Sequence, residues 1–88
     1  MKVEFRGSFV RDLKSIVDQT LLERVREIIE SAEQVNSLAA ISNLKKLKGP
    51  GNYYRIRVGN YRIGIAFEGK NVTFVRFLHR KDIYKYFP

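Results

Sequence analysis

The sequence predicts an α+β fold in which two helices near the N-terminus pack on one side of an antiparallel sheet, in the order β-α-α-β-β-β. Three observations support this fold class. A short alternating stretch opens the chain, apolar residues then recur at helical spacing over residues 9–32, and three alternating segments follow over residues 53–79. A chain of 88 residues forms one core, so we expect a single small domain spanning residues 1–88.

The first half of the chain predicts one strand and two helices. Val3 and Phe5 alternate with charged residues, which indicates a strand with one apolar face. Ser8 is a candidate N-cap for a first helix, whose apolar residues are Phe9, Leu13, Ile16 and Val17. Thr20 and Glu23 form a capping-box pattern at the start of a second helix. The apolar stripe of this second helix comprises Leu21, Leu22, Val25, Ile28, Ile29 and Ala32.

The second half of the chain predicts a three-stranded meander. Residues 34–43 first predict a short helix or an irregular turn, and the glycines, proline and asparagine at 49–52 predict a turn. Gly59 and Asn60 then supply a two-residue hairpin turn. Alternating apolar and polar residues predict the three strands, at 53–58, 61–67 and 72–79.

The basic residues are unevenly distributed along the chain. The whole sequence has 17 Lys and Arg against 9 Asp and Glu, yet residues 1–43 contain six basic and seven acidic residues. Residues 44–88 contain eleven basic and two acidic residues, together with nine of the eleven aromatic residues. Guanidinium groups neutralise phosphates and aromatic rings stack on bases, so this composition indicates a nucleic acid as the partner.

Composition also excludes several classes of protein. The chain has no cysteine and one histidine, which excludes disulfides and thiolate metal sites and predicts that no metal or cofactor is bound. No apolar run approaches the ~20 residues of a membrane span, and the N-terminus lacks an apolar signal stretch. We therefore expect a cytoplasmic protein without a membrane partner.

Alternation sorts the side chains of the meander into two sets. One set is apolar and is expected to pack under the helices; it comprises Tyr54, Ile56, Val58, Tyr61, Ile63, Ile65, Phe67, Val75 and Phe77. The other set includes Arg55, Arg57, Arg62, Phe74, Arg76, Leu78 and Arg80. Gly64 and Ala66 lie between these arginines, which predicts a shallow concave patch. The solvent-facing side of a sheet is polar in any case, but five arginines without a carboxylate from a strand favour an anion-binding surface.

Two stretches of the second half resemble the signature of the RelE-family toxins, within the RelE/ParE superfamily of type II toxin–antitoxin systems. These are residues 47–62, which contain Leu-Lys-Gly and Tyr-Arg-Ile-Arg-Val-Gly-Asn-Tyr-Arg, and residues 78–84, Leu-His-Arg-Lys-Asp-Ile-Tyr. The resemblance implies a RelE-like fold with the element order derived above. It also implies a toxin that enters the ribosomal A site and cleaves mRNA, and a cognate antitoxin protein that wraps the toxin and blocks it.

The resemblance further implies catalytic roles for five residues. Transfer of the phosphoryl group to the neighbouring ribose 2′-OH needs a base, an acid and cations that stabilise the transition state, but no metal. Arg55 and Arg57 correspond to the family's basic pair, and Arg62 corresponds to its phosphate-stabilising arginine. Arg80 corresponds to the arginine after the last strand, and Tyr84 to the C-terminal tyrosine that orients or stacks on the substrate.

The basic pair departs from the family pattern, because the best-known ribosome-dependent members have lysines there. Arginine stays protonated, whereas a lysine can be tuned towards neutrality, so the general base is unassigned. Lysines on the preceding segment could reach the site, and we expect RNA contacts from Lys45, Lys46, Lys48, Arg76 and Lys81. His79 is the best acid–base candidate by chemistry, although alternation places it on the core side, where a structural hydrogen bond is the alternative.

Two other functions stay open at this point. A ParE-like toxin shares this fold but acts as a gyrase inhibitor and has no nuclease site; the combination of Arg62, Arg80 and Tyr84 argues against it. The second is an RNA- or ribosome-binding module with weak or no cleavage, owing to the arginines at the basic pair.

Overall fold

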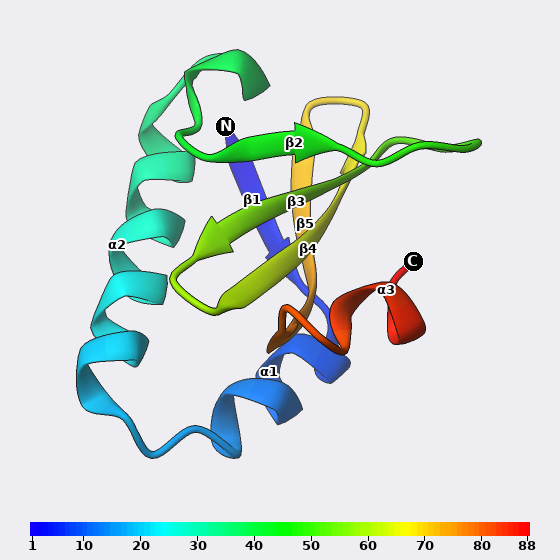
Figure 1. The fold of residues 1–88 in the computed structure, drawn as a ribbon. Coiled ribbons are helices and arrows are strands. Elements are labelled where there is room, and N and C mark those ends of the chain that lie inside the picture. The colour runs from blue at the N-terminus through cyan, green and yellow to red at the C-terminus, as the bar shows by residue number, and fades with distance from the viewer.

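The computed structural model describes residues 1–88 and contains a five-stranded sheet with three α-helices (Figure 1). In chain order the elements are β1 (Lys2–Phe5), α1 (Gly7–Lys14), α2 (Gln19–Gln34), a 3₁₀ turn (Leu38–Ala40), β2 (Leu44–Lys46), β3 (Tyr53–Val58), β4 (Tyr61–Glu68), β5 (Asn71–His79) and α3 (Ile83–Tyr86). The predicted β-α-α-β-β-β order is confirmed, and β2 and α3 are additions to it. None of the helices is both long and apolar enough to cross a membrane.

The strands lie in the order β1-β5-β4-β3-β2. Antiparallel pairing, as predicted, joins β2 to β3, β3 to β4 and β4 to β5. β1 instead pairs parallel with β5, with Val3 beside Val72 and Phe5 beside Phe74, so the sheet is mixed. Between these two strands the chain passes through both long helices and the other three strands, and a long connection of this kind permits parallel pairing.

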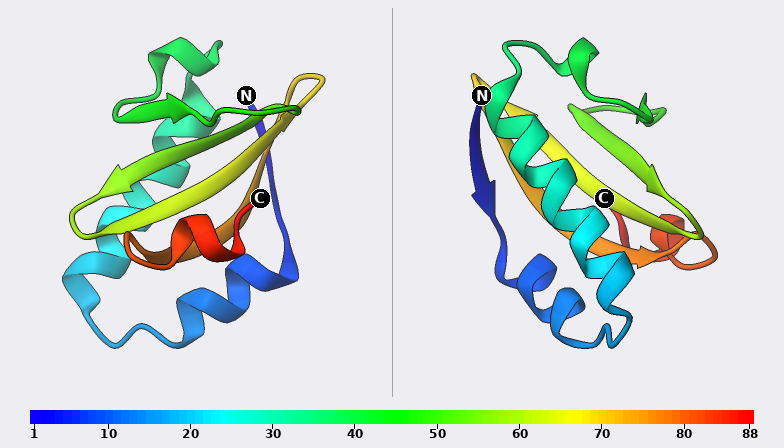
Figure 2. Two further views of the ribbon diagram at one scale, coloured as in Figure 1. Left: turned by 45° about the vertical axis from the view of Figure 1, so that its right-hand side comes forward. Right: turned by 90° about the vertical axis from the view of Figure 1, so that its left-hand side faces the viewer.

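The core lies between α2 and the sheet. Figure 2 shows α2 across one side of the sheet and α3 on the other. The buried residues of α2 are Leu21, Val25 and Ala32, all members of the predicted stripe. Phe9 of α1 joins them, and the strands contribute Ile56, Val58, Ile63, Ile65, Val72, Phe74 and Phe77. The opposite side of β3 and β4 is therefore free to present polar side chains.

The helix starts differ from those that the sequence predicted. Asp18, and not Thr20, caps α2, and its carboxylate accepts a hydrogen bond from the backbone N–H of Leu21 at 3.2 Å. Aspartate is as good an N-cap as serine or threonine, and its position two residues earlier lengthens the helix. Ser8 lies inside α1, which has Arg6 at its N-cap position and no side-chain cap.

An irregularity in β5 changes which of its residues face the core. Ile65 lies opposite Phe74 and Gly64 lies opposite Arg76, so Val75 has no partner of its own on β4. This extra residue interrupts the alternation, as a β-bulge does. Phe74, predicted on the arginine side, is consequently fully buried in the core, and Val75, predicted in the core, is only half-buried and lies outside the core cluster.

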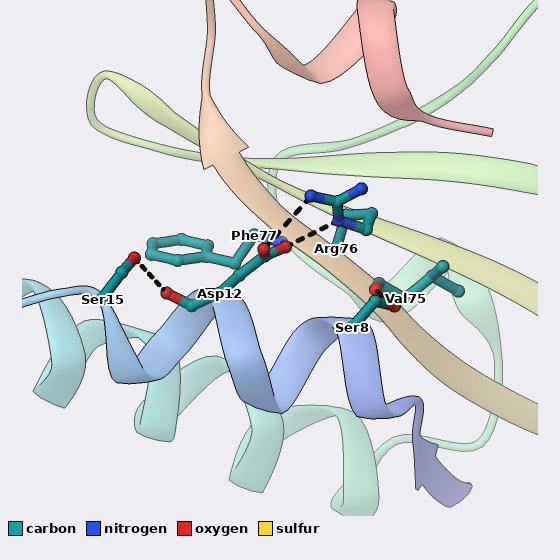
Figure 3. Close-up of polar contacts among 6 residues, drawn as sticks. All are labelled: Ser8, Asp12, Ser15, Val75, Arg76 and Phe77. Carbon is teal, nitrogen blue, oxygen red and sulfur yellow. Dashed lines mark hydrogen bonds and ion pairs between the residues drawn. The ribbon is translucent and has the colours of Figure 1, made fainter.

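Helix α1 covers the edge of β5 beyond the point where β1 ends (Figure 3). The hydroxyl of Ser8 donates a hydrogen bond to the carbonyl of Val75 at 2.6 Å. The carboxylate of Asp12 accepts from the backbone N–H of Phe77 at 2.9 Å and forms an ion pair with Arg76, with Nε and Oδ2 2.8 Å apart. Two side chains of α1 thus occupy backbone groups that an edge strand would otherwise expose.

Candidate nucleic-acid interface

Cross-strand pairing assembles a cationic surface on the side of the sheet away from the core. Arg57 on β3 lies directly opposite Arg62 on β4. Arg55 lies between Gly64 on β4 and Lys45 on β2. Residues directly opposite each other in an antiparallel pair project from the same face. The predicted sharing of one face by Arg55, Arg57 and Arg62 is therefore confirmed, and β2 extends this face with Lys45.

Arg62 lies at the centre of this surface. Arg62 is partly buried as a residue, and its guanidinium donates hydrogen bonds to the carbonyls of Gly59 and Tyr61, at 2.9 and 2.8 Å. Burial lowers the pKa of Arg62 from its usual value, and the charges of neighbouring arginines lower it further, while the phenol of Tyr84 acts to raise it. The arginines that act on it are Arg55, Arg57 and Arg80. We call Arg62 and these three residues the arginine cluster; each of the three, and Tyr84, lies within electrostatic reach of Arg62.

The members of the arginine cluster have no acidic partner inside the protein. The four ion pairs of the structure are Arg6–Glu68, Arg26–Glu30, Arg76–Asp12 and Lys85–Asp82. Arg55 donates instead to the carbonyl of Asn43 at 3.3 Å, and its buried Nε has no partner. Arg57 and Arg80 are exposed. The cluster therefore keeps its positive charge available to a ligand from outside.

The C-terminal segment fills the depression that the sequence predicted as open. Phe87 is 3% exposed, and a Cβ atom placed on Gly64 would lie 2.7 Å from its ring. This ring and that of Tyr53 form an edge-to-face pair, with centroids 5.6 Å apart. The patch is consequently not a free concavity at Gly64. The inserted segment instead brings Tyr84, 61% exposed, to the arginine cluster.

Three predicted RNA-binding lysines lie beside this segment. A surface pocket of about 370 Å³ is lined by Lys45, Lys46, Leu47, Lys48, Tyr84, Phe87 and Pro88. The pocket therefore combines ammonium groups with an aromatic and apolar wall, next to the arginine cluster. A larger pocket of about 810 Å³, which includes Met1 and Phe67 in its lining, lies where β4 turns into β5 and contains none of the predicted site residues.

Other predicted residues are not brought to the arginine cluster. The guanidinium of Arg76 is held by Asp12, which raises the pKa of Arg76 above its usual value, and it lies 5.9 Å from the ring centroid of Tyr86. His79 packs edge-on against Tyr61 on the core side, and its Nδ1 accepts from the backbone N–H of Lys81 at 3.1 Å. This contact is the structural hydrogen bond given above as the alternative. Lys81 itself is exposed in the turn before α3.

Sequence reasoning missed the parts of Asp12, Gly64 and Phe87 in this arrangement. Asp12 gave no signal, because its partner Arg76 is 64 residues away. Gly64 did give one, since a glycine inside a strand often marks the close approach of another segment. Alternation alone predicts an empty depression at Gly64, because the chain beyond residue 79 carries no periodic pattern that predicts where it packs.

Comparison with known proteins identifies the group to which this chain belongs. Residues 3–84 match the family model described as the ParE toxin of type II toxin–antitoxin system, parDE. A protein named Toxin RelE3 from Methanocaldococcus jannaschii is 52% identical over 89 residues, which cover the whole of both chains. The chain belongs to the RelE/ParE toxin superfamily. The resemblance stated from the sequence is thereby confirmed, and the protein is a toxin of the type II class.

Solved structures agree with this membership. The toxin matches a chain of the RelB–RelE antitoxin–toxin complex from Methanococcus jannaschii with 49% identity and a TM-score of 0.83, over 97% of its length and 99% of that chain. It also matches a chain of the archaeal RelE–RelB complex from Pyrococcus horikoshii with 23% identity and a TM-score of 0.70, over 90% of its length and 93% of that chain. At 23% identity the second match supports only a shared fold, whereas the first, at 49% identity, is also close in sequence.

Proposed function

We propose that this toxin is a metal-independent endoribonuclease that cleaves mRNA on the ribosome and so inhibits translation. The observation that carries the proposal is that Arg55, Arg57 and Arg62 share one face within electrostatic reach of Arg80 and Tyr84, and that none of these arginines has an acidic partner inside the protein. Strand β3 supplies two arginines of the cluster, β4 supplies one, and the turn after β5 supplies the fourth. A phosphate chain with stackable bases is the ligand that this combination of charge and aromatic ring suits.

The proposed reaction transfers a phosphoryl group within the RNA chain. The ribose 2′-oxygen forms a bond to phosphorus as its proton passes to a base, and the bond from phosphorus to the 5′-oxygen breaks as that oxygen takes up a proton. The products are a 2′,3′-cyclic phosphate and a free 5′-hydroxyl. Arg62 and Arg80 stabilise the charge that grows on the non-bridging oxygens. Arg55 and Arg57 hold the phosphate chain, and Tyr84 orients or stacks on the nucleotide.

The lysines of the 370 Å³ pocket are better placed than His79 to take part in proton transfer. His79 lies on the core side with Nδ1 engaged, whereas Lys45 is directly opposite Arg55 and lines the same pocket as Tyr84. We assign RNA contacts to Lys45, Lys46, Lys48 and Lys81. Arg76, which the sequence placed with them, is assigned instead to its ion pair with Asp12.

The toxin is proposed to act in the cytoplasm and to be neutralised by a cognate antitoxin. The relatives from Methanococcus and Pyrococcus are described in complexes with RelB. A partner that neutralises the charge of the arginine cluster needs acidic side chains, so we expect the antitoxin to bind through an acidic, amphipathic segment. Co-expression with the adjacent reading frame should relieve growth inhibition and co-purify the two proteins. Failure of both would contradict this partner.

Primer extension on ribosome-bound mRNA tests the nuclease directly. The purified toxin should produce defined ends, and Arg62→Ala or Arg80→Ala should each reduce cleavage by roughly 10²–10³-fold, the range for one lost transition-state donor. Ribosome binding should fall much less, because the other cations remain. Arg26→Ala, on the exposed side of α2, is the control that changes charge without touching the site. Equal cleavage by wild type and the Arg62→Ala, Arg80→Ala double variant would refute the assignment.

The family model also carries the name of ParE, which keeps gyrase inhibition as a second candidate. Against it stands the naming of both relatives at about half identity as RelE. The two activities leave different traces. A gyrase poison produces protein-linked DNA breaks in treated cells, and a nuclease produces new 5′ ends in mRNA.

A further inference from the structure

We propose that Phe87 is a positioning residue, which holds Tyr84 at the arginine cluster by inserting its ring against Gly64. The inference rests on the proposed function, because its catalytic consequence requires that Tyr84 act on RNA. It assigns a role to the C-terminal aromatic residue and to the glycine of β4 on which its ring packs.

Helix α3 cannot fix the position of Tyr84 by itself. It has four residues, about one turn, and a helix this short is not stable without tertiary contacts. Its buried anchors are Ile83, which is 0% exposed, and Phe87, which follows its last residue and is 3% exposed; the ring of exposed Tyr86 also lies 5.9 Å from the guanidinium of Arg76. The backbone N–H of Phe87 closes the turn by donating to the carbonyl of Ile83 at 2.8 Å. Tyr84 lies between these two anchors and is exposed.

The anchor at Phe87 is built for one ring in one place. Three ring atoms of Phe87 lie 2.7 to 2.8 Å from where a Cβ on Gly64 would be, so any residue larger than glycine must displace the ring. Tyr53 closes the site from the side. Arg62 precedes Gly64 by two residues on the same strand and therefore projects from the same face. The ring thus ties the C-terminal segment to the strand that carries the central cation.

Two substitutions disturb this contact from opposite sides. Phe87→Ala removes the ring, and Gly64→Ala removes the space that the ring occupies. A shift of about 1 Å in a positioning group lowers the rate roughly 10²-fold, so each variant should cleave ribosome-bound mRNA roughly 10²-fold more slowly than wild type. Phe87→Leu keeps an apolar side chain in the site and should recover most of the rate. Val25→Ala, a buried truncation on α2, is the control for loss of stability alone.

A double-mutant cycle separates positioning from general damage. If Phe87 acts through Tyr84, then Phe87→Ala should slow wild type but add almost nothing to Tyr84→Ala. ¹⁵N relaxation of residues 83–86 provides a readout that does not depend on activity. The backbone order parameters should fall from rigid values near 0.85 to below about 0.6 in Phe87→Ala and stay high in Val25→Ala.

Several results would overturn the proposal. One is full activity of Phe87→Ala, and another is the same fold loss from Phe87→Ala with and without Tyr84. Unchanged order parameters at residues 83–86 in Phe87→Ala would also contradict it. Wild-type protein that leaves mRNA intact would refute the nuclease function itself and with it the catalytic role of Phe87, whereas the relaxation data would then still decide whether Phe87 holds α3 in place.

Discussion

Asp12 is predicted to contribute more to stability than any other acidic residue of the chain. Its carboxylate accepts from Arg76 Nε at 2.8 Å, from the second guanidinium nitrogen at 3.2 Å and from the backbone N–H of Phe77 at 2.9 Å. The side chains of Arg76 and Asp12 are 26% and 12% exposed, so water replaces these contacts poorly. A backbone N–H left without an acceptor costs about 1–3 kcal/mol. Loss of an ion pair that is only partly exposed adds about 1 kcal/mol or more.

We therefore expect Asp12→Ala to lower the free energy of unfolding by about 2–4 kcal/mol. For a domain of this size the melting temperature should fall by roughly 10–30 °C. Asp12→Asn keeps an oxygen for the N–H of Phe77 and should cost about half as much. Glu30→Ala is the matched control. Glu30 Oε1 lies 3.6 Å from Arg26 Nε, and the side chains of Arg26 and Glu30 are 79% and 58% exposed, so loss of this ion pair should cost less than about 0.5 kcal/mol.

Urea and thermal denaturation followed by circular dichroism measure these differences. A cycle with Arg76→Ala isolates the pair, since most of the Asp12→Ala effect beyond the N–H of Phe77 should vanish when Arg76 is already absent. Similar losses from Asp12→Ala and Glu30→Ala would refute the reasoning. RNA affinity supplies a second check: Arg76→Ala should lower stability and leave affinity nearly unchanged, because its guanidinium is committed to Asp12.

Three further predictions concern the arginine cluster. If about five phosphates are contacted, RNA affinity should fall roughly 10²-fold between about 50 and 200 mM salt in filter binding; a flat response would contradict the electrostatic interpretation. Arg57→Gln should raise the melting temperature by roughly 2–4 °C at low salt, because it relieves a like-charged pair with Arg62 worth about 0.5 kcal/mol; a loss of stability would count against repulsion. Arg55→Lys and Arg57→Lys should speed cleavage if the missing base limits the rate, and an unchanged rate would place the base elsewhere.

The sequence predicts those parts of the fold that depend on local periodicity. The apolar stripe of α2 and the alternation along β3 and β4 place the core and the cationic face correctly, because each signal is contained within a few consecutive residues. The pair Arg26–Glu30 on the exposed side of α2 likewise has the i,i+4 spacing that brings side chains together on a helix. Phe74 is misplaced because a bulge at Val75 depends on how β5 meets β4, and neither strand encodes that irregularity alone.

The candidate site is only partly predictable for the same reason. The shared face of Arg55, Arg57 and Arg62 follows from alternation, because every second residue of a strand projects from the same side of the sheet. Arg76 projects from the same side of the sheet, yet its guanidinium pairs with Asp12 at the sheet edge. This pairing depends on where α1 packs against the sheet. The position of a residue in the alternation determines the face from which its side chain projects. The partner it then finds is decided by elements far away in the sequence.

The distribution of carboxylates separates structural arginines from functional ones. Seven acidic residues lie in residues 1–43, and the only one of them that pairs with a meander arginine takes Arg76. Arg55, Arg57, Arg62 and Arg80 repel one another without such relief, and this repulsion contributes to the lowered pKa of Arg62. Folding alone gains nothing from that arrangement, because a paired or neutral residue would be more stable at each position. The unrelieved charge therefore suits an external polyanion, which under the proposed function is RNA when the toxin is active and the acidic segment of an antitoxin when it is not.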